Sequence, residues 1–489
     1  MDYLSIKFVI FVVCLLTVFH SISFFSKGRR NPHWLLLVGN IIFYCSFGWK
    51  NLIFLCFTVI STFYCAQILT KSRHKKFFFI GCIMLNAFIW FTFKILLWNL
   101  DVIQYLGINL FVFPEDSIFV PIGISYFTLM ALGYLIDVYT NKIQPERSLW
   151  KYFTFISYFP GIVQGPISRY ETLSAQLFHH KTPSIEAMRK GLLCVLFGLV
   201  KKLVIANRIA PIVSMIFSKH QSLGGIMLYG GMIGYSIQLY ADFSGCVDIC
   251  RGVSFLFNIE MPHNFERPYL ATSIKQFWRN WHMTLSSWLR DYVYIPLGGS
   301  RKGKIRGYIN ILFTFIVSGI WHGAGAHFII WGMLHACYQI IGHYTFNVRT
   351  KIKSVLGIRE NSFSERIYQT IITFHLVAFA WIFFWIDDLQ IASRYIKRMF
   401  TVSGLHTFFD GPLSAIGLNG TVLAVLFFNI IIWFAIEIFS KRQENVVNGV
   451  LNCHLFLRWG IYLLLIFNVI LFGAYGPGYS LSSFMYGGF

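Results

Sequence analysis

The residue of this sequence best placed for acid–base chemistry is a histidine at the end of a long apolar run. The segment Ser318-Gly319-Ile320-Trp321-His322-Gly323 closes a run that starts after a basic cluster ending at Arg306. Sixteen helical residues at about 1.5 Å each would place His322 roughly 24 Å from those charges, deep in a hydrocarbon core about 30 Å thick. A neutral imidazole accepts a proton from a hydroxyl at neutral pH. His322 is therefore a candidate catalytic base, although a core histidine satisfied by hydrogen bonds is the favoured interpretation on spacing alone.

A second histidine stands in a tryptophan-rich segment at 276–291, Q-F-W-R-N-W-H-M-T-L-S-S-W-L-R-D. The spacing predicts one helix with Trp278, Trp281 and His282 on the same face, suited to the bilayer interface or to a polar cavity. His282 is therefore a candidate second catalytic or substrate-binding group, and an interfacial anchor is the alternative. The candidate substrate contacts around the two histidines are Trp278, Arg279, Asn280, Trp321 and Ser318.

A third polar group lies beside an apolar helix, where Asp242 is followed by Asp248. Buried carboxylates need partners, and we expect an arginine such as Arg251, Arg267 or Arg279 to supply one. Asp242 is a candidate substrate contact, although a structural polar network is the favoured interpretation. No metal site is expected, because Cys246 and Cys250 have no His or further Cys to complete a ligand set.

The composition indicates that these groups belong to a membrane protein. Of the 489 residues, 56% are hydrophobic and 12% are charged, whereas soluble domains carry roughly 45–50% and about 25%. The 41 basic and 20 acidic residues give a net charge of +21. The bases cluster between apolar runs, at 27–30, 71–76 and 301–306, which is typical of cytoplasmic loops. The expected partner of this charge is therefore the lipid bilayer, and no nucleic acid is expected.

The apolar runs predict an all-α, polytopic integral membrane protein with roughly 11–13 membrane segments. The middle of the chain is irregular, because Pro160, Gly161, Gly165 and Pro166 interrupt one run and 191–200 is too short to cross alone. This pattern predicts re-entrant helices around a cavity. The longest polar stretch, 347–366, predicts a loop. Helices are expected at 5–25, 33–48, 50–70, 77–98, 118–138, 224–243, 307–321, 327–345, 367–386, 414–439 and 456–475.

An ordered series of these segments resembles the membrane-bound O-acyltransferase family. The strongest part runs from N-F-E-R-P-Y at 264–269 through F-W-R-N-W-H at 277–282 and Y-I-P-L-G-G at 294–299 to S-G-I-W-H-G at 318–323. Segments 121–139, 159–170 and 238–245 add to the likeness. Within the family, the bacterial branch that contains the membrane subunit of alginate O-acetyltransferase is the most similar. The first hundred residues and those after about 350 match in hydropathy alone.

The resemblance implies a single domain over 1–489, with a motif-bearing core at about 118–345, C-terminal helices at about 367–475 and a central tunnel. It implies His322 as the deep catalytic histidine and His282 as its catalytic partner or a substrate-orienting group. Such enzymes move an acyl group from a thioester to a hydroxyl, so acetyl-CoA or another acyl thioester is expected as co-substrate, with no bound cofactor. The expected place is the cytoplasmic membrane of a bacterium.

The expected acceptor is an extracytoplasmic polysaccharide of the alginate type, or a partner acetyltransferase protein that acetylates it. Two alternatives within the family are D-alanyl transfer to teichoic acid and O-acetylation of peptidoglycan. From another class, the intramembrane His and Asp residues would suit a proton-coupled transporter. The lack of an internal repeat and the ordered motif series both argue against a transporter.

Overall fold

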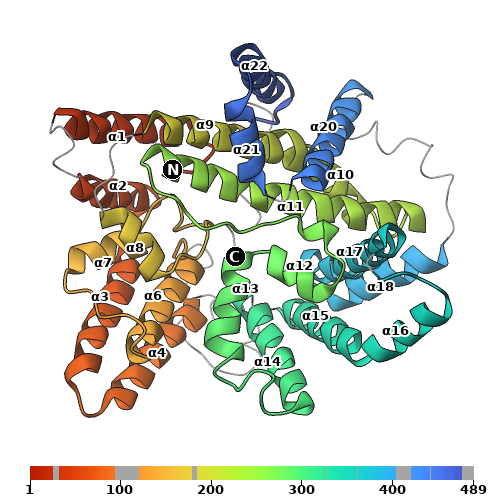
Figure 1. Ribbon diagram of the computed structural model, residues 1–489, viewed down its shortest axis with the longest axis horizontal. Coiled ribbons are helices and arrows are strands. Elements are labelled where there is room, and N and C mark those ends of the chain that lie inside the picture. Colours follow the sequence, from red (N-terminus) through yellow and green to blue (C-terminus); the bar gives the residue numbers. More distant parts are fainter. Residues whose placement is uncertain are drawn as a thin grey trace. The chain divides into compact units, whose positions relative to one another are not determined.

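A computed structural model describes residues 1–25, 32–93, 121–178, 184–323, 325–360, 362–402, 420–440 and 442–475. Within these ranges every regular element is a helix (Figure 1), which confirms the predicted all-α class. The basic cluster 27–30 and the end of the predicted helix 77–98 lie outside the described residues. The chain divides into two compact units, which are described separately.

The first unit comprises 1–195 and 247–262 of the described chain. Its interior is held by polar side chains that satisfy the backbone where helices break. The Asn40 side chain accepts a hydrogen bond from the backbone N–H of Phe159 at 2.9 Å and donates one to the Ser157 hydroxyl at 3.1 Å. These two bonds hold the irregular segment that follows α7, where the sequence predicts an interruption at Pro160. The helices of this unit are α1 (Ile6–Phe25), α2 (His33–Cys45), α3 (Trp49–Lys71), α4 (Lys75–Phe91), α6 (Ile124–Tyr139), α7 (Leu149–Ile156) and α8 (Tyr170–Phe178).

The second unit comprises 196–246 and 263–485 and carries every candidate site residue. Two further helices, α9 (Ile185–Leu199) and α11 (Gly225–Leu256), contribute residues to both units. The remaining elements belong to the second unit: η4 (Val200–Ala206), α10 (Asn207–Ser218), η5 (Pro268–Leu270), α12 (Ile274–Asn280), α13 (Met283–Leu289), η6 (Arg290–Tyr294), α14 (Lys304–His322), α15 (Ala326–Tyr344), α16 (Phe346–Val355), α17 (Phe363–Trp385), α18 (Leu389–Thr401), α20 (Gly420–Phe439), α21 (Gln443–Asn452) and α22 (Leu455–Phe472).

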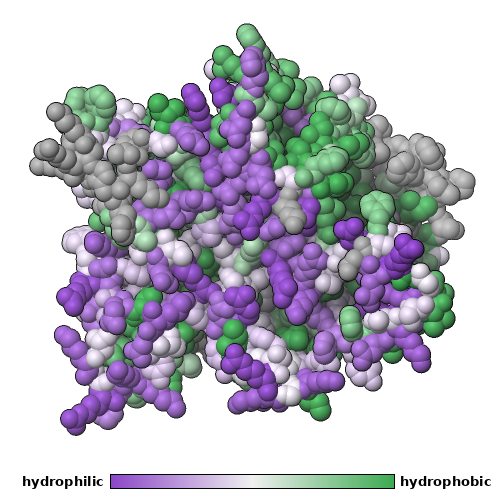
Figure 2. Space-filling model, viewed as in Figure 1, coloured by the Kyte–Doolittle hydropathy of each residue, from purple (hydrophilic) through white to green (hydrophobic). Residues whose placement is uncertain are grey.

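Five of the described helices are long and apolar enough to cross a membrane, namely α1, α3, α17, α20 and α22. Figure 2 shows hydrophobic side chains gathered over α20 and around α22, whereas hydrophilic side chains cover α21. Side chains that are this apolar and this exposed are stable only in lipid. The chain is a polytopic membrane protein, as its composition predicts. The count of 11–13 segments and the central tunnel remain predictions.

One local prediction is wrong, and one short apolar run belongs to a longer helix. The run 191–200 does not stand alone, because α9 continues through the π-helix η4 into α10. The helix does not stop at Lys201 and Lys202, since both side chains are buried and stabilised by neighbours. The polar stretch 347–366 is not simply a loop. It contains α16, whose apolar residues recur at helical spacing among the polar ones.

Candidate active site

A close-packed hairpin of α14 and α15 positions His322 (Figure 1). A Cβ atom at Gly319 would clash with the Phe328 carbonyl oxygen, and one at Gly332 would clash with that of Phe315. These two glycines therefore allow the helix backbones to approach closely. His322 is the last residue of α14, so its side chain lies where the hairpin turns.

Aromatic rings surround the imidazole of His322, which is only 2% exposed. Ring centroids lie 4.9 Å away at Trp321, 5.0 Å at Trp331 and 5.2 Å at Phe384, all at steep angles. Trp331 comes from α15 and Phe384 from α17, so three helices build the wall. Such a wall excludes water and strengthens any electrostatic interaction made inside it.

His282 occupies a break between two short helices. The single helix predicted over 276–291 is wrong, because α12 ends at Asn280 and α13 begins at Met283. His282 has φ 43° and ψ 53°, a left-handed conformation that is uncommon for a residue other than glycine. The Asn264 side-chain oxygen holds this break by accepting from the backbone N–H and the hydroxyl of Thr284 at 3.1 and 2.9 Å. A partner distant in sequence thus caps the start of α13.

The two histidines contact the same tryptophan. The ring of Trp321 lies 5.9 Å from His282 and 4.9 Å from His322, between centroids, so the structure brings together three of the predicted site residues. Phe243 packs edge-on against His282 at 4.8 Å. Burial lowers the pKa of His282 to about 3, because a buried imidazole loses the hydration of its charged form. His282 is therefore neutral at physiological pH.

The hydrogen bond to Asn264 indicates which nitrogen of His282 carries the proton. Nδ1 lies 3.3 Å from the Asn264 oxygen that also accepts from Thr284. Since that oxygen acts as an acceptor, Nδ1–H donates and Nε2 of the neutral ring is the acceptor. His282 thus presents Nε2 as a hydrogen-bond acceptor in a fixed orientation.

Trp278 directs its polar atom to a histidine that the sequence analysis missed. Its indole Nε1–H donates to Nδ1 of His335, at 3.2 Å, and the His335 ring lies 5.2 Å from Trp331. His335 is fully buried in α15. Its place inside the predicted segment 327–345 is the signal that could have found it, because an ionisable residue within a membrane segment is costly without a role.

Three buried polar atoms near His322 have no hydrogen-bond partner among the described residues: the Ser318 hydroxyl, Trp331 Nε1 and His335 Nε2. Ser318 precedes His322 by one helical turn, and Trp331 and His335 come from the facing helix. Buried polar groups in folded proteins are normally satisfied by protein, water or ligand. These atoms are therefore the ones available to a bound substrate or to water.

The carboxylate of Asp242 forms a buried ion pair with Lys202 of η4, a partner that the sequence analysis did not name. Lys201 lies over the ring of Trp433 at 5.6 Å, and Tyr240 donates a hydrogen bond to Glu437 of α20. This pairing fits the favoured interpretation of Asp242 as part of a structural network. Lysine is the partner because η4 continues the helix past α9 and aligns Lys202 with α11.

The remaining two candidates lie at the edge of the site. Arg279 is exposed, so its guanidinium is not part of the buried wall. Asn280 is partly buried, and its backbone oxygen accepts from the N–H of Glu266 at 3.0 Å. A role for either residue in substrate binding remains a prediction.

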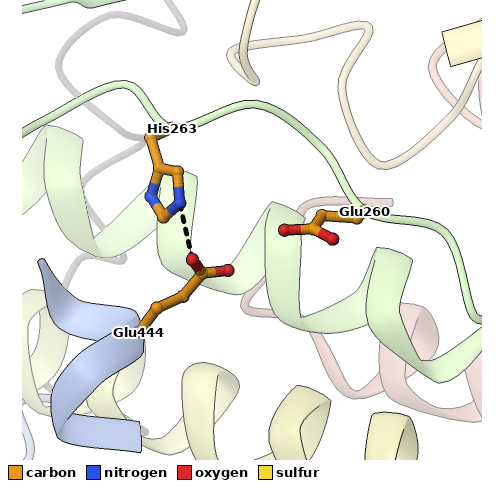
Figure 3. A group of neighbouring side chains, drawn as sticks. All are labelled: Glu260, His263 and Glu444. Carbon is orange, nitrogen blue, oxygen red and sulfur yellow. Dashed lines mark hydrogen bonds and ion pairs between the residues drawn. The ribbon is translucent and has the colours of Figure 1, made fainter. Parts of the chain in front are cut away.

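A hydrogen bond outside the aromatic wall supports the segment that carries Asn264. Nε2 of His263 lies 2.8 Å from Oε2 of Glu444 (Figure 3), and Arg442 Nε lies 3.6 Å from Oε2 of Glu266. Both contacts connect the start of α21 to residues on either side of Asn264. They help to hold in place the side chain that orients His282.

Residues 90–384 match the family described as MBOAT, membrane-bound O-acyltransferase family. The match covers more than half of the chain, including His282, His322 and His335. The chain belongs to the membrane-bound O-acyltransferase family. It is accordingly an O-acyltransferase, and the transporter alternative is set aside.

Several named relatives of this acyltransferase share its sequence over most of its length. The probable alginate O-acetylase AlgI of Pseudomonas aeruginosa is 30% identical over 89% of this chain and 81% of its own. The peptidoglycan O-acetyltransferase of Helicobacter pylori is 30% identical over 78% and 76%. The teichoic acid D-alanyltransferase of Bacillus subtilis is 29% identical over 55% of this chain and 70% of its own.

The arrangement in this membrane-bound O-acyltransferase is suited to proton transfer between neutral groups. His282 and His322 are both buried and both pack against Trp321. A neutral imidazole can take a proton from a hydroxyl as a new bond forms to its oxygen.

Proposed function

We propose that the chain transfers an acetyl group from a cytoplasmic thioester, such as acetyl-CoA, to a hydroxyl of an extracytoplasmic polysaccharide or of a partner protein that acetylates it. The observation that carries this proposal is the pair of buried imidazoles that both contact Trp321. A polysaccharide acceptor is supported by the names of the relatives, which act on alginate, peptidoglycan and teichoic acid.

In the proposed reaction His322 is the general base. It removes the proton from the acceptor hydroxyl as that oxygen attacks the acyl carbon of the thioester. The C–O bond forms, the C–S bond breaks, and the leaving thiolate takes the proton from the imidazolium. A thioester is already activated, so the reaction requires no covalent intermediate on the enzyme.

The groups around His322 orient the acceptor hydroxyl and stabilise the negative charge that develops on the acyl carbonyl oxygen. His282 Nε2 accepts a hydrogen bond from the acceptor hydroxyl or from a water that positions it. Trp331 Nε1–H, His335 Nε2–H and the Ser318 hydroxyl can donate to the carbonyl oxygen as negative charge develops there. Donors fixed in a dry site cost little reorganisation, so their contribution is large.

The proposed substrates come from opposite sides of the membrane. The basic segment 301–306 directly precedes α14 and would attract an anionic donor on the cytoplasmic side. His322 lies at the other end of that 19-residue helix, which is about 28 Å long. A passage beside α14 would therefore let donor and acceptor meet at His322.

The decisive experiment uses the full chain in nanodiscs with acetyl-labelled acetyl-CoA. We expect thioester cleavage by the wild type, at least about a hundredfold less by His322→Ala, and an unchanged rate for His454→Ala, which removes an exposed histidine. Transfer of label is then followed to alginate, to peptidoglycan fragments and to a candidate partner protein. Cleavage that survives His322→Ala would exclude the proposed role of His322.

The same assay separates the two related acceptors. Label on peptidoglycan but not on alginate would establish the activity named for the Helicobacter relative. If acetyl-CoA is not cleaved and a carrier-bound D-alanyl thioester is, the activity is that of the Bacillus relative. Either result overturns the alginate-type proposal while leaving acyl transfer in place.

A further inference from the structure

Helix α16 (Phe346–Val355) connects α15 to α17 and has no buried residue. Its apolar residues nevertheless form one stripe, because Val348, Ile352, Val355 and Leu356 follow the spacing i, i+4, i+7 and i+8. Their side chains are 59%, 52%, 79% and 66% exposed. Within the described chain, this stripe is left open, and apart from Phe346 at its start the rest of the helix is polar.

Basic residues flank the stripe on both edges. At 3.6 residues per turn, Lys351 lies beside Val355 on one edge and Arg349 beside Leu356 on the other. Arg359 follows just beyond the helix, and all three bases are exposed. Residues 346–360 contain four bases and one acid. An apolar stripe between bases is typical of helices that lie in the interface of an anionic membrane.

An ion pair fixes α16 at the end of a membrane-crossing helix. Lys353 pairs with Glu365 in the first turn of α17, and Glu365 also accepts from Gln369 Nε2 at 2.8 Å. Since α17 is long and apolar enough to cross the membrane, its first turn lies near the membrane surface. The ion pair therefore holds α16 at the depth of the lipid headgroups.

The side of the membrane follows from the preceding hairpin. The Tyr308 hydroxyl and His343 Nδ1 lie 2.9 Å apart, so the start of α14 and the end of α15 are at the same end of the hairpin. The basic segments 301–306 and 349–359 thus flank one end. Basic residues concentrate on the cytoplasmic side of membrane proteins.

We propose that α16 is an interfacial helix of the cytoplasmic leaflet that binds anionic phospholipids. Val348, Ile352, Val355 and Leu356 enter the boundary between headgroups and acyl chains. Lys351, Arg349 and Arg359 bind lipid phosphates. Lys353 remains with Glu365 and anchors the helix. This role is independent of the acyl-transfer chemistry proposed above.

The depth of α16 is tested with the environment-sensitive fluorescent amino acid Anap at Ile352, on the stripe, or at Ser354, on the opposite face. The full chain is reconstituted in nanodiscs of three parts phosphatidylcholine to one part phosphatidylglycerol. We expect blue-shifted emission from position 352, with quenching by lipids spin-labelled near the headgroup, and water-like emission from position 354. Water-like emission from both positions, or equal quenching at both, would overturn the proposal.

The lipid preference is tested with R349Q/K351Q/R359Q, and R394Q/K397Q is the control, because these two exposed bases lie on α18, which follows the opposite end of α17. Phosphatidylglycerol retained per protein after mild detergent extraction is measured by mass spectrometry. We expect at least about fivefold less for the α16 variant, since even one base near an anionic surface contributes about that factor and three are removed, and no change for the control. No loss in the α16 variant, or an equal loss in both, would contradict a lipid site on α16.

Discussion

The indole of Trp278 donates its N–H to Nδ1 of His335 across 3.2 Å, and both side chains are buried. Because Nδ1 accepts this bond, the neutral ring of His335 carries its proton on Nε2. The same ring packs against Trp331, which contacts His322. A tryptophan on α12 therefore sets the tautomer of a histidine on α15, and that histidine packs against the same Trp331 as the proposed base.

Trp278→Phe should lower acyl transfer while leaving the fold intact. The change removes the donor to His335 but keeps an aromatic ring, so a loss of about fivefold in rate is expected from one hydrogen bond of about 1 kcal/mol. The acetyl-CoA cleavage rate measures the effect. Trp459→Phe, at an exposed tryptophan of α22, is the control, and an equal effect of both changes would exclude a role for the Trp278–His335 bond.

His335→Gln should retain more activity than His335→Phe. Glutamine keeps an N–H donor in place of Nε2–H, whereas phenylalanine keeps the ring volume and loses the donor. If His335 only fills space, phenylalanine will be the better replacement. The ratio of the two rates, with kcat and KM determined separately, distinguishes the two roles.

Burial of His282 predicts a loss of stability in acid. Its pKa is about 3 in the folded chain and about 6.5 when unfolded. Below pH 6.5 the unfolded chain binds the proton and the folded chain does not, so this contribution falls as the pH drops towards 3, by about 1.4 kcal/mol per pH unit. We expect thermal unfolding between pH 7 and pH 5 to be less pH-dependent for His282→Gln than for the wild type. The same slope in both proteins would contradict the assignment.

The ion pair between Lys202 and Asp242 should be costly to break and less costly to replace. Lys202→Met leaves a buried carboxylate alone, for which about 3–5 kcal/mol of destabilisation is expected. The double change Lys202→Met with Asp242→Leu removes both charges and should recover most of that loss. Unfolding temperature in detergent measures both. A double variant no more stable than the single one would show that Asp242 has other partners that matter more.

Gly332→Ala should separate the two helices that position His322. The added methyl would meet the Phe315 carbonyl oxygen, so we expect a lower unfolding temperature together with reduced acyl transfer. Gly342→Ala is the matched control on the same helix, because no atom lies within 4 Å of the methyl it would add. The control should be neutral or slightly stabilising, since alanine is the better helix former.

The sequence by itself determined the class of the protein and most of its helices. An apolar run long enough to cross a membrane folds as a helix, because a backbone in lipid must satisfy its hydrogen bonds within its own segment. For this reason the predicted 5–25, 50–70 and 456–475 lie within two or three residues of α1, α3 and α22. The ordered motifs likewise pointed to His322 and His282, because a motif is a run of neighbouring residues and can be recognised without the fold.

Only the tertiary structure decided which polar groups meet. Asn264 holds the break at His282 by accepting hydrogen bonds from Thr284. Lys202 forms an ion pair with Asp242, and Trp278 donates a hydrogen bond to His335. None of these pairs is close in sequence, so no periodicity encodes them. Contacts of this kind depend on how the helices pack, and packing is decided by shape and hydrogen bonding across the whole unit.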